Sequence, residues 1–139
     1  MSAVNPYLHF NGNAEEAFTF YKSVFGGEFA MIMRYKDAPP EQRMGEDNGE
    51  NILHISFPIG QAILMGGDVP EVHRVTMGTN FYISISPGSE KEADDLFNGL
   101  SAGGQVMMPI GKTFWGSYFG MLKDKYAVQW MISFDGRQP

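Results

Sequence analysis

The sequence predicts an α+β fold in which two βαβββ modules form one domain, residues 1–139. Three observations lead to this prediction. The length of 139 residues suits a single domain with its own core. Each half of the chain contains one amphipathic helix pattern among several short apolar runs. The two halves also resemble each other, which is typical of a duplicated supersecondary unit.

The first module, about residues 1–68, starts with a strand at 6–10 followed by an amphipathic helix. Asn13 is well placed to cap that helix, and Gly26-Gly27 ends it, because glycine readily adopts the left-handed conformation at a helix end. Short apolar runs separated by turn residues then predict strands at residues 28–35, 51–58 and 61–65.

The second module, about residues 79–135, repeats this order of elements. Ala17 and Tyr21 in the first helix correspond to Ala93 and Phe97 in the second at a constant offset (93 − 17 = 76 and 97 − 21 = 76). A glycine pair again closes the helix. The predicted elements are a strand at residues 81–85, a helix at 90–100 and strands at 105–108, 116–122 and 128–134.

Composition narrows the function classes. Ten basic and sixteen acidic residues give a net charge of −6, which disfavours nucleic acid and anionic membranes as partners. The absence of cysteine excludes disulfides, thiolate nucleophiles and Cys-ligated metal centres. The chain has neither a signal-peptide pattern nor a run of about 20 apolar residues, so we expect a cytoplasmic protein.

Residues 36–50 lie between predicted strands and show no hydrophobic periodicity. Two prolines and two glycines among charged residues indicate a mobile loop. A solvated connection is the simpler interpretation, and a lid over a ligand is the alternative.

Several motifs in the right order resemble the glyoxalase/bleomycin-resistance/extradiol-dioxygenase superfamily, also called vicinal oxygen chelate, and its PhnB-like branch in particular. The resemblance implies a glyoxalase-like, cupped β-sheet with flanking helices, in which each module forms half of the cup. It also implies ligands inside the cup and a homodimer. The motifs are AEEAFTFYKSVFGG at residues 14–27, YLHFNG at 7–12, an LMGGD turn at 64–68, TFWG at 113–116 and QWM at 129–131.

Metal-using members of this superfamily hold a divalent ion with four side chains, usually His, Gln or Glu. Landmark alignment places Pro6, Ile63, Asn80 and Met131 at those positions, and none of these residues is a competent ligand for such an ion except, weakly, Asn80. A shift of one residue would bring Tyr7 or Phe81 into the cup instead, which does not restore the site. We therefore expect no metal tetrad and no cofactor.

The three histidines have different expected environments. His9 is expected to face the helix layer as a structural imidazole. His54 is expected to share a strand face with Ile52 and Ser56, and that face is a candidate wall of the cup. His73 follows a Pro-Glu turn and is most simply a solvated surface residue.

The acidic residues favour structural roles, since most lie on helices, and Asp68 and Asp124 suit turns at strand ends. The aromatic residues and methionines give the remaining signal, because an apolar cavity with few polar groups is typical of a small-molecule site. Trp115 stands out because it lies in a glycine-flanked stretch. The predicted ligand-binding residues are Met65, Trp115, Tyr118, Met131 and His54.

Three functions remain open. The leading one is a binding protein for a small, partly apolar molecule, without the metal tetrad. The second is a divalent-metal lyase, isomerase or dioxygenase with a displaced site that uses His54. The third is a structural or partner-binding dimer with a closed cup. A methyltransferase is disfavoured, because no glycine-rich nucleotide loop opens a helix.

Overall fold

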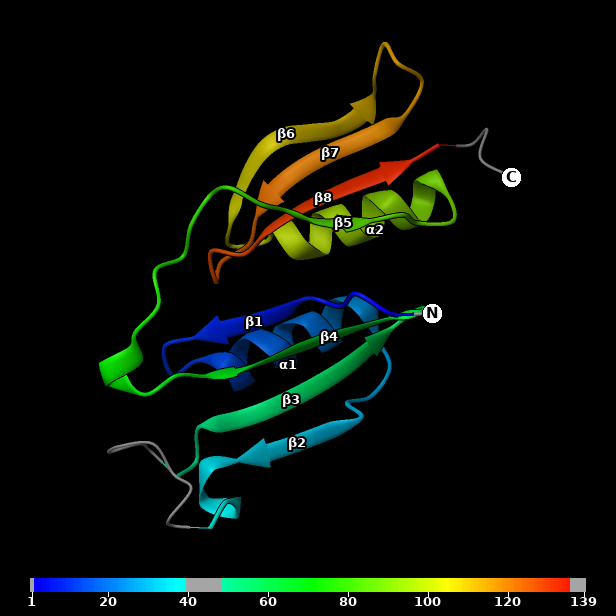
Figure 1. Ribbon diagram of the computed structural model, residues 1–139. Coiled ribbons are helices and arrows are strands. Elements are labelled where there is room, and N and C mark those ends of the chain that lie inside the picture. Colours follow the sequence, from blue (N-terminus) through cyan, green and yellow to red (C-terminus); the bar gives the residue numbers. More distant parts are fainter. Residues whose placement is uncertain (1, 40–48, 136–139) are drawn as a thin grey trace. The chain divides into compact units, whose positions relative to one another are not determined.

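The computed structural model describes residues 2–39 and 49–135 of the chain. The chain divides into two compact units, Met1–Thr76 and Met77–Pro139. Each unit contains a four-stranded sheet and one α-helix of 12 residues (Figure 1). The predicted α+β fold with two βαβββ modules is confirmed.

Unit 1 has the strand order β1-β4-β3-β2, in which β1 and β4 run parallel and the other neighbours are antiparallel. A short 3-10 turn follows β2 and another follows β4. The elements are β1 (Tyr7–Phe10), α1 (Ala14–Phe25), β2 (Met31–Arg34), η1 (Tyr35–Asp37), β3 (Ile52–Ile59), β4 (Ala62–Asp68) and η3 (Glu71–His73).

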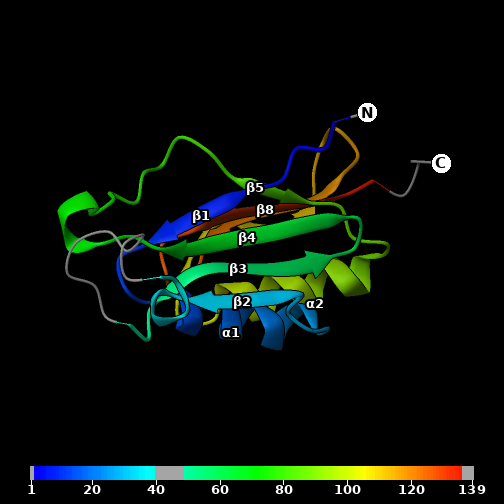
Figure 2. The same ribbon diagram turned by 60° about the horizontal axis from the view of Figure 1, so that its bottom comes forward.

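The core of unit 1 lies between the sheet and α1, which covers one face of the sheet (Figure 2). Leu8 and Phe10 point to the helix, where the Phe10 ring meets Phe18 edge-on at 6.2 Å between centroids. Gly66 on β4 allows this packing, because a Cβ there would lie 2.6 Å from the Leu8 carbonyl oxygen and 2.8 Å from the Phe18 ring.

Unit 2 has the order β5-β8-β7-β6, with β5 parallel to β8 and the other neighbours antiparallel. Its core lies between the sheet and α2, where Trp130, Ile132 and Leu122 meet the apolar face of the helix. The elements are β5 (Ile83–Ile85), α2 (Glu90–Ser101), β6 (Gln105–Lys112), β7 (Tyr118–Lys123) and β8 (Gln129–Phe134).

The internal repeat appears directly in the two helices. Both have 12 residues, and their first and last residues differ by the predicted offset (90 − 14 = 76 and 101 − 25 = 76). Gly26 and Gly27 adopt φ values of 77° and 85° after α1, and Gly103 adopts 77° after α2. The predicted glycine helix ends are confirmed.

The predicted cap of α1 is wrong. The Asn13 side chain makes no capping hydrogen bond. Oδ1 of Asp68 accepts hydrogen bonds from the backbone N–H groups of Gly12 (3.0 Å) and Ala14 (2.9 Å), and Oδ2 accepts one from Ile52 (2.9 Å). A buried carboxylate at the end of β4 therefore takes the place of the local cap.

Two strands are longer than predicted. β4 continues through Gly66 and Gly67 to Asp68, where the sequence predicted a turn. β6 continues to Lys112, passing through Pro109. Proline is tolerated there because β6 is an edge strand, and its pairing with β7 contains irregularities.

Most of the loop predicted at residues 36–50 lies outside the described residues. Its two ends lie together, since the Lys36 N–H donates to the Gly49 carbonyl at 3.0 Å and Lys36 Nζ pairs with Glu50 at 2.7 Å. In the part of the chain that the structure describes, no helix is long and apolar enough to cross a membrane.

Candidate functional site

Each sheet has a face turned away from its own helix, and we call this the open face of that unit. Residues paired across neighbouring strands share a face, so the register assigns each side chain. In unit 1, Tyr7 pairs with Met65, which pairs with Ser56, which pairs with Met31. The open face of unit 1 comprises Tyr7, His9, Met31, Met33, His54, Ser56, Ile63 and Met65.

A β-bulge in the pairing of β2 with β3 places His54 and Ile52 on opposite faces. His54 pairs with Met33, yet the next residue, Arg34, pairs with Ile52. The bulge gives β3 one extra residue and reverses the alternation. His54 shares the open face with Ser56 by regular alternation, as predicted. The bulge places the fully buried Ile52 on the helix face, so that part of the prediction is wrong.

His9 also points away from the helix, contrary to the prediction. Leu8 and Phe10 are buried against α1, and His9 alternates with them, so its exposed ring lies on the open face beside Tyr7. The two rings meet edge-on at 5.1 Å between centroids. The apolar residues of β1 determine which side of the strand meets the helix.

Tyr7 lies between the two histidines on this face. Its hydroxyl is 3.2 Å from Nδ1 of His54, and the ring centroids are 5.6 Å apart. Partial burial raises the pKa of the Tyr7 hydroxyl above its ordinary value. The hydroxyl is therefore protonated at neutral pH and can donate a hydrogen bond.

The open face of unit 2 has a cluster of methionines and one phenylalanine among polar side chains. Met131 pairs with Met121 and with Ser84, and Met121 pairs with Met108. Phe119 lies on the same face, because it pairs with Ser133, two residues beyond Met131 on β8. The open face of unit 2 comprises Ser84, Gln105, Met108, Phe119, Met121, Lys123, Gln129, Met131 and Ser133.

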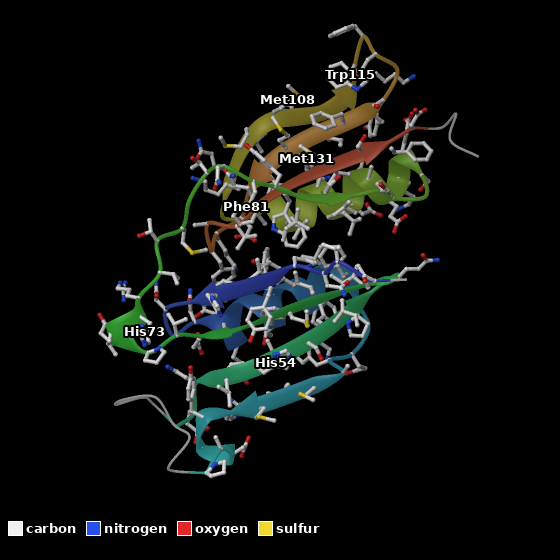
Figure 3. The ribbon with its side chains drawn as sticks, viewed as in Figure 1. His54, His73, Phe81, Met108, Trp115 and Met131 are labelled. Carbon is white, nitrogen blue, oxygen red and sulfur yellow. The ribbon has the colours of Figure 1, made fainter. Side chains whose placement is uncertain are left out.

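Trp115 extends this open face from the turn between β6 and β7 (Figure 3). Its ring meets Phe119 edge-on at 5.7 Å between centroids, and the residue is 47% exposed. Thr113 closes the turn, since its hydroxyl donates to the Ser117 carbonyl at 2.8 Å and accepts from the Ser117 N–H at 3.1 Å. The turn thus holds an indole on the open-face side of its sheet.

Tyr118 lies on the opposite side of its sheet from Met131 and Trp115. Its hydroxyl donates a 2.6 Å hydrogen bond to Oδ1 of Asp94 on α2. This bond, followed by partial burial and the nearby negative charge, raises the pKa of the Tyr118 hydroxyl. The structure thus brings Trp115 and Met131 to one face and separates Tyr118 from them.

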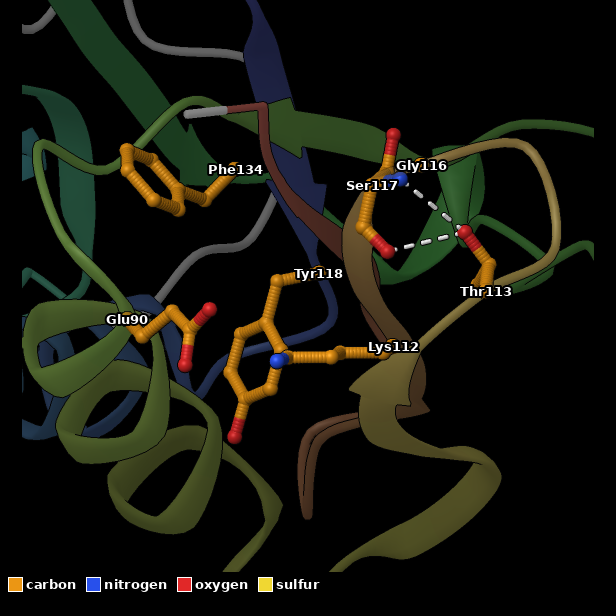
Figure 4. Close-up of a pocket in the computed structure, with 7 residues that line it drawn as sticks. All are labelled: Glu90, Lys112, Thr113, Gly116, Ser117, Tyr118 and Phe134. Carbon is orange, nitrogen blue, oxygen red and sulfur yellow. Dashed lines mark hydrogen bonds between the residues drawn. The ribbon is translucent and has the colours of Figure 1, made fainter. Parts of the chain in front are cut away.

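A pocket of about 280 Å³ lies beside Tyr118 (Figure 4). It is open to solvent and mixes charged, hydroxyl and aromatic groups. Its position against the first turn of α2 makes it distinct from the open face of unit 2. It is lined by Glu90, Lys112, Thr113, Gly116, Ser117, Tyr118 and Phe134.

The four positions aligned with the superfamily's metal ligands do not fit a divalent ion. Pro6 has no side-chain donor, and its carbonyl oxygen accepts a 3.1 Å hydrogen bond from the Met65 N–H. Ile63 and Met131 lie on β4 and β8, and Asn80 precedes β5. Within residues 2–39 and 49–135, no group of three or more His, Cys, Asp or Glu side chains could hold a metal ion.

The remaining predicted residues have clear positions. Met65 and His54 lie on the open face of unit 1. His73 is exposed in η3, as predicted. Asp124 has the expected turn role: Oδ1 accepts from the Tyr126 and Val128 N–H groups, and Oδ2 accepts from Trp130 Nε1 at 2.8 Å.

Sequence reasoning missed Tyr7 as a site residue. A signal was available, since Tyr7 alternates with Leu8 and Phe10, whose apolar side chains suit the helix face. The contact with His54 was not predictable in the same way, because it depends on the pairing of β1, β4 and β3.

Known proteins share this sequence and fold. A family described as 3-demethylubiquinone-9 3-methyltransferase matches residues 2–133. Protein YjdN of Escherichia coli (strain K12) is 28% identical over 148 residues, covering 98% of this chain and 97% of that protein. Protein PA1353 from Pseudomonas aeruginosa has a solved structure with 35% identity and a TM-score of 0.87, covering 97% of this chain and 98% of that one. The solved structure of the PhnB protein from Bacillus cereus has 29% identity and a TM-score of 0.76, and the match covers 96% of this chain and 99% of that one.

These matches define the class of protein: the chain has the glyoxalase/bleomycin-resistance fold of the vicinal oxygen chelate superfamily. Because one family match spans nearly the whole chain, the chain belongs to the family described as 3-demethylubiquinone-9 3-methyltransferase, in the PhnB-like branch. The resemblance found in the sequence is confirmed. The family description does not establish a reaction for this chain, since a fold hosts many functions.

Proposed function

We propose that this protein binds a small, partly apolar molecule on the open face of a unit, without the superfamily's metal tetrad. The observation that carries the proposal is the 47% exposed Trp115, held edge-on to Phe119 on the face that contains Met131. An exposed indole costs free energy unless another molecule covers it, and aromatic rings and methionines make adaptable binding surfaces.

The polar side chains of the open faces support the same proposal. Unit 1 presents Met31, Met33 and Met65 together with Tyr7 and His54. Small-molecule sites combine mostly apolar walls with a few polar groups that orient the ligand. Within the described residues, the open face of unit 1 has this composition.

The test is binding of N-phenyl-1-naphthylamine, a neutral apolar dye whose fluorescence rises in an apolar site. We expect saturable binding, weakened about tenfold or more in Trp115→Ala, because loss of a large buried aromatic contact is worth about 1.5–3 kcal/mol. Val72→Ala is the control, since Val72 is an apolar residue that is 74% exposed in η3 of unit 1, away from the turn that carries Trp115. No saturable binding, or equal affinity in Trp115→Ala, would contradict the proposal.

The second candidate is a divalent-metal lyase, isomerase or dioxygenase with a displaced site. The observation that favours it is the arrangement on unit 1, where His9 and His54 lie on either side of the Tyr7 ring. Imidazole and phenol oxygen are suitable ligands for zinc, iron and nickel. Metal analysis separates this candidate from the first.

The proposal includes a homodimer and a cytoplasmic location. Support for the dimer comes from the edge strands, since β2 exposes Met31 and Ile32, and β6 exposes Val106 and Met107. Exposed apolar edge strands are suited to pairing with another chain. Sedimentation of the purified protein and cell fractionation would test the two statements separately.

A further inference from the structure

We propose that Tyr7 and His54 form the polar end of a binding site on the open face of unit 1, where they receive an anionic oxygen group, such as a carboxylate or sulfonate, on an otherwise apolar ligand. This inference rests on the proposed function and specifies the chemical class of its ligand.

The first step is that the Tyr7 side chain extends across the neighbouring strand toward His54. Tyr7 is on β1 and His54 is on β3, and β4 lies between these strands. The Tyr7 ring passes over Gly67, where a Cβ would lie 3.3 Å from the Tyr7 hydroxyl and 2.5 Å from the Leu53 carbonyl oxygen. The glycine therefore provides the space in which the hydroxyl approaches Nδ1 of His54 at 3.2 Å.

The second step concerns the protons of the pair. A neutral His54 and Tyr7 together carry two N–H or O–H protons, and their mutual hydrogen bond uses one of them. If Nδ1 accepts from Tyr7, Nε2 carries the remaining proton. If Nδ1 donates to Tyr7, the hydroxyl proton remains. A protonated His54 leaves still more donors, so the pair has a donor for a ligand oxygen in every one of these states.

The third step is the charge of the surface. Among the described residues, the titratable side chains of the unit 1 open face are Tyr7, His9 and His54, and none is a carboxylate. Asp68 at the end of β4 turns to the other side, where three backbone N–H groups hold its carboxylate. On a chain with a net charge of −6, this patch of donors without acids favours an anion.

The fourth step is the surroundings of the pair. Met65 lies beside Tyr7 in register, and Met33 lies opposite His54. These apolar neighbours offer contact to the apolar body of a ligand, and a bound ligand that covers the pair from water would strengthen the hydrogen bond to its charged oxygen. The face therefore suits a ligand with an apolar body and one anionic end.

The experiment compares two dyes with the same aromatic body. 1-Anilinonaphthalene-8-sulfonate is anionic, and N-phenyl-1-naphthylamine lacks the sulfonate. For Tyr7→Phe and for His54→Gln we expect the dissociation constant of the anionic dye to rise about tenfold or more, since a hydrogen bond to a charged group contributes about 1.5–3 kcal/mol. The affinity for the neutral dye should change less than twofold.

His73→Gln is the matched control, because His73 is exposed in η3 and should leave both affinities unchanged. Circular dichroism and melting curves of each variant establish that it is folded. If both dyes bind the wild type but the two variants weaken neither dye, or weaken both equally, the inference is overturned while the proposed function stands. If neither dye binds the wild type, both fail.

Discussion

Oδ1 of Asp68 accepts a 2.9 Å hydrogen bond from the backbone N–H of Ala14, so the end of β4 caps a helix that begins 54 residues earlier in the chain. The same carboxylate reaches the start of β3 through the Ile52 N–H. Three elements of unit 1 therefore meet at one buried side chain, which is 4% exposed. These contacts account for Asp68 as a structural residue.

We predict that Asp68→Ala destabilises the protein by about 3–5 kcal/mol. The substitution leaves three backbone donors without the carboxylate, and each buried unpaired donor costs about 1–3 kcal/mol, partly offset by water that enters the space. Asp68→Asn retains one acceptor oxygen, so its free energy of unfolding should fall less than that of Asp68→Ala. Urea unfolding followed by circular dichroism measures both free energies.

Asp95→Ala is the control for this prediction. Asp95 pairs with Lys91 on the exposed face of α2, and solvent screening leaves such a surface pair little effect on stability. A loss for Asp68→Ala no larger than that of Asp95→Ala would show that the three hydrogen bonds do not hold unit 1 together.

A second prediction concerns the bond from Tyr118 to Asp94. We expect Tyr118→Phe to lower the free energy of unfolding at neutral pH, because the variant loses a 2.6 Å hydrogen bond between β7 and α2. The pKa of Tyr118 is raised in the folded state. The stabilisation is therefore fully present below the unfolded pKa of about 10 and is lost as the pH rises through the folded value.

The measurement is chemical unfolding of the wild type and of Tyr118→Phe from neutral to strongly alkaline pH. The difference between the two should narrow above about pH 10, since the ionised hydroxyl repels the Asp94 carboxylate. A difference that stays constant with pH would mean that the hydroxyl's proton does not link the helix to the strand.

Much of the fold could be predicted because its signals are local. Helical spacing and the glycine pairs predicted both helices, and the offset between Ala17 and Ala93 predicted their equivalence. The errors occurred where tertiary packing decides. Gly66 and Gly67 have the composition of a turn, yet β4 continues through both. Glycine is needed at these strand positions because Phe18 and the neighbouring backbone approach too closely for a side chain.

The site was less predictable for the same reason. A shift in pairing at Met33 and Arg34 places His54 and Ile52 on opposite faces, and no local sequence pattern in β3 predicts that shift. Tyr118 is aromatic and next to Phe119, but strand alternation sends it to Asp94 on the helix side. His9 could have been placed correctly from its apolar neighbours.

A final prediction concerns metal. We expect protein purified without chelator to contain far less than one metal ion per chain, and added Zn²⁺, Ni²⁺, Mn²⁺ or Fe²⁺ to leave the melting temperature unchanged. The physical reason is the donor set, because Pro6, Ile63 and Met131 offer no hard or imidazole ligand at the aligned positions. Elemental analysis and a melting scan measure both quantities.

The decisive control is His54→Ala in the same scan. A site that binds one metal per chain would raise the melting temperature of the wild type by mass action, and removing its imidazole ligand would abolish that rise. Near-stoichiometric metal with a rise that His54→Ala removes would make the Tyr7, His9 and His54 group a displaced metal centre. The anionic ligand oxygen assigned to the Tyr7–His54 pair would then bind the metal ion instead, and the divalent-metal enzyme would become the leading function.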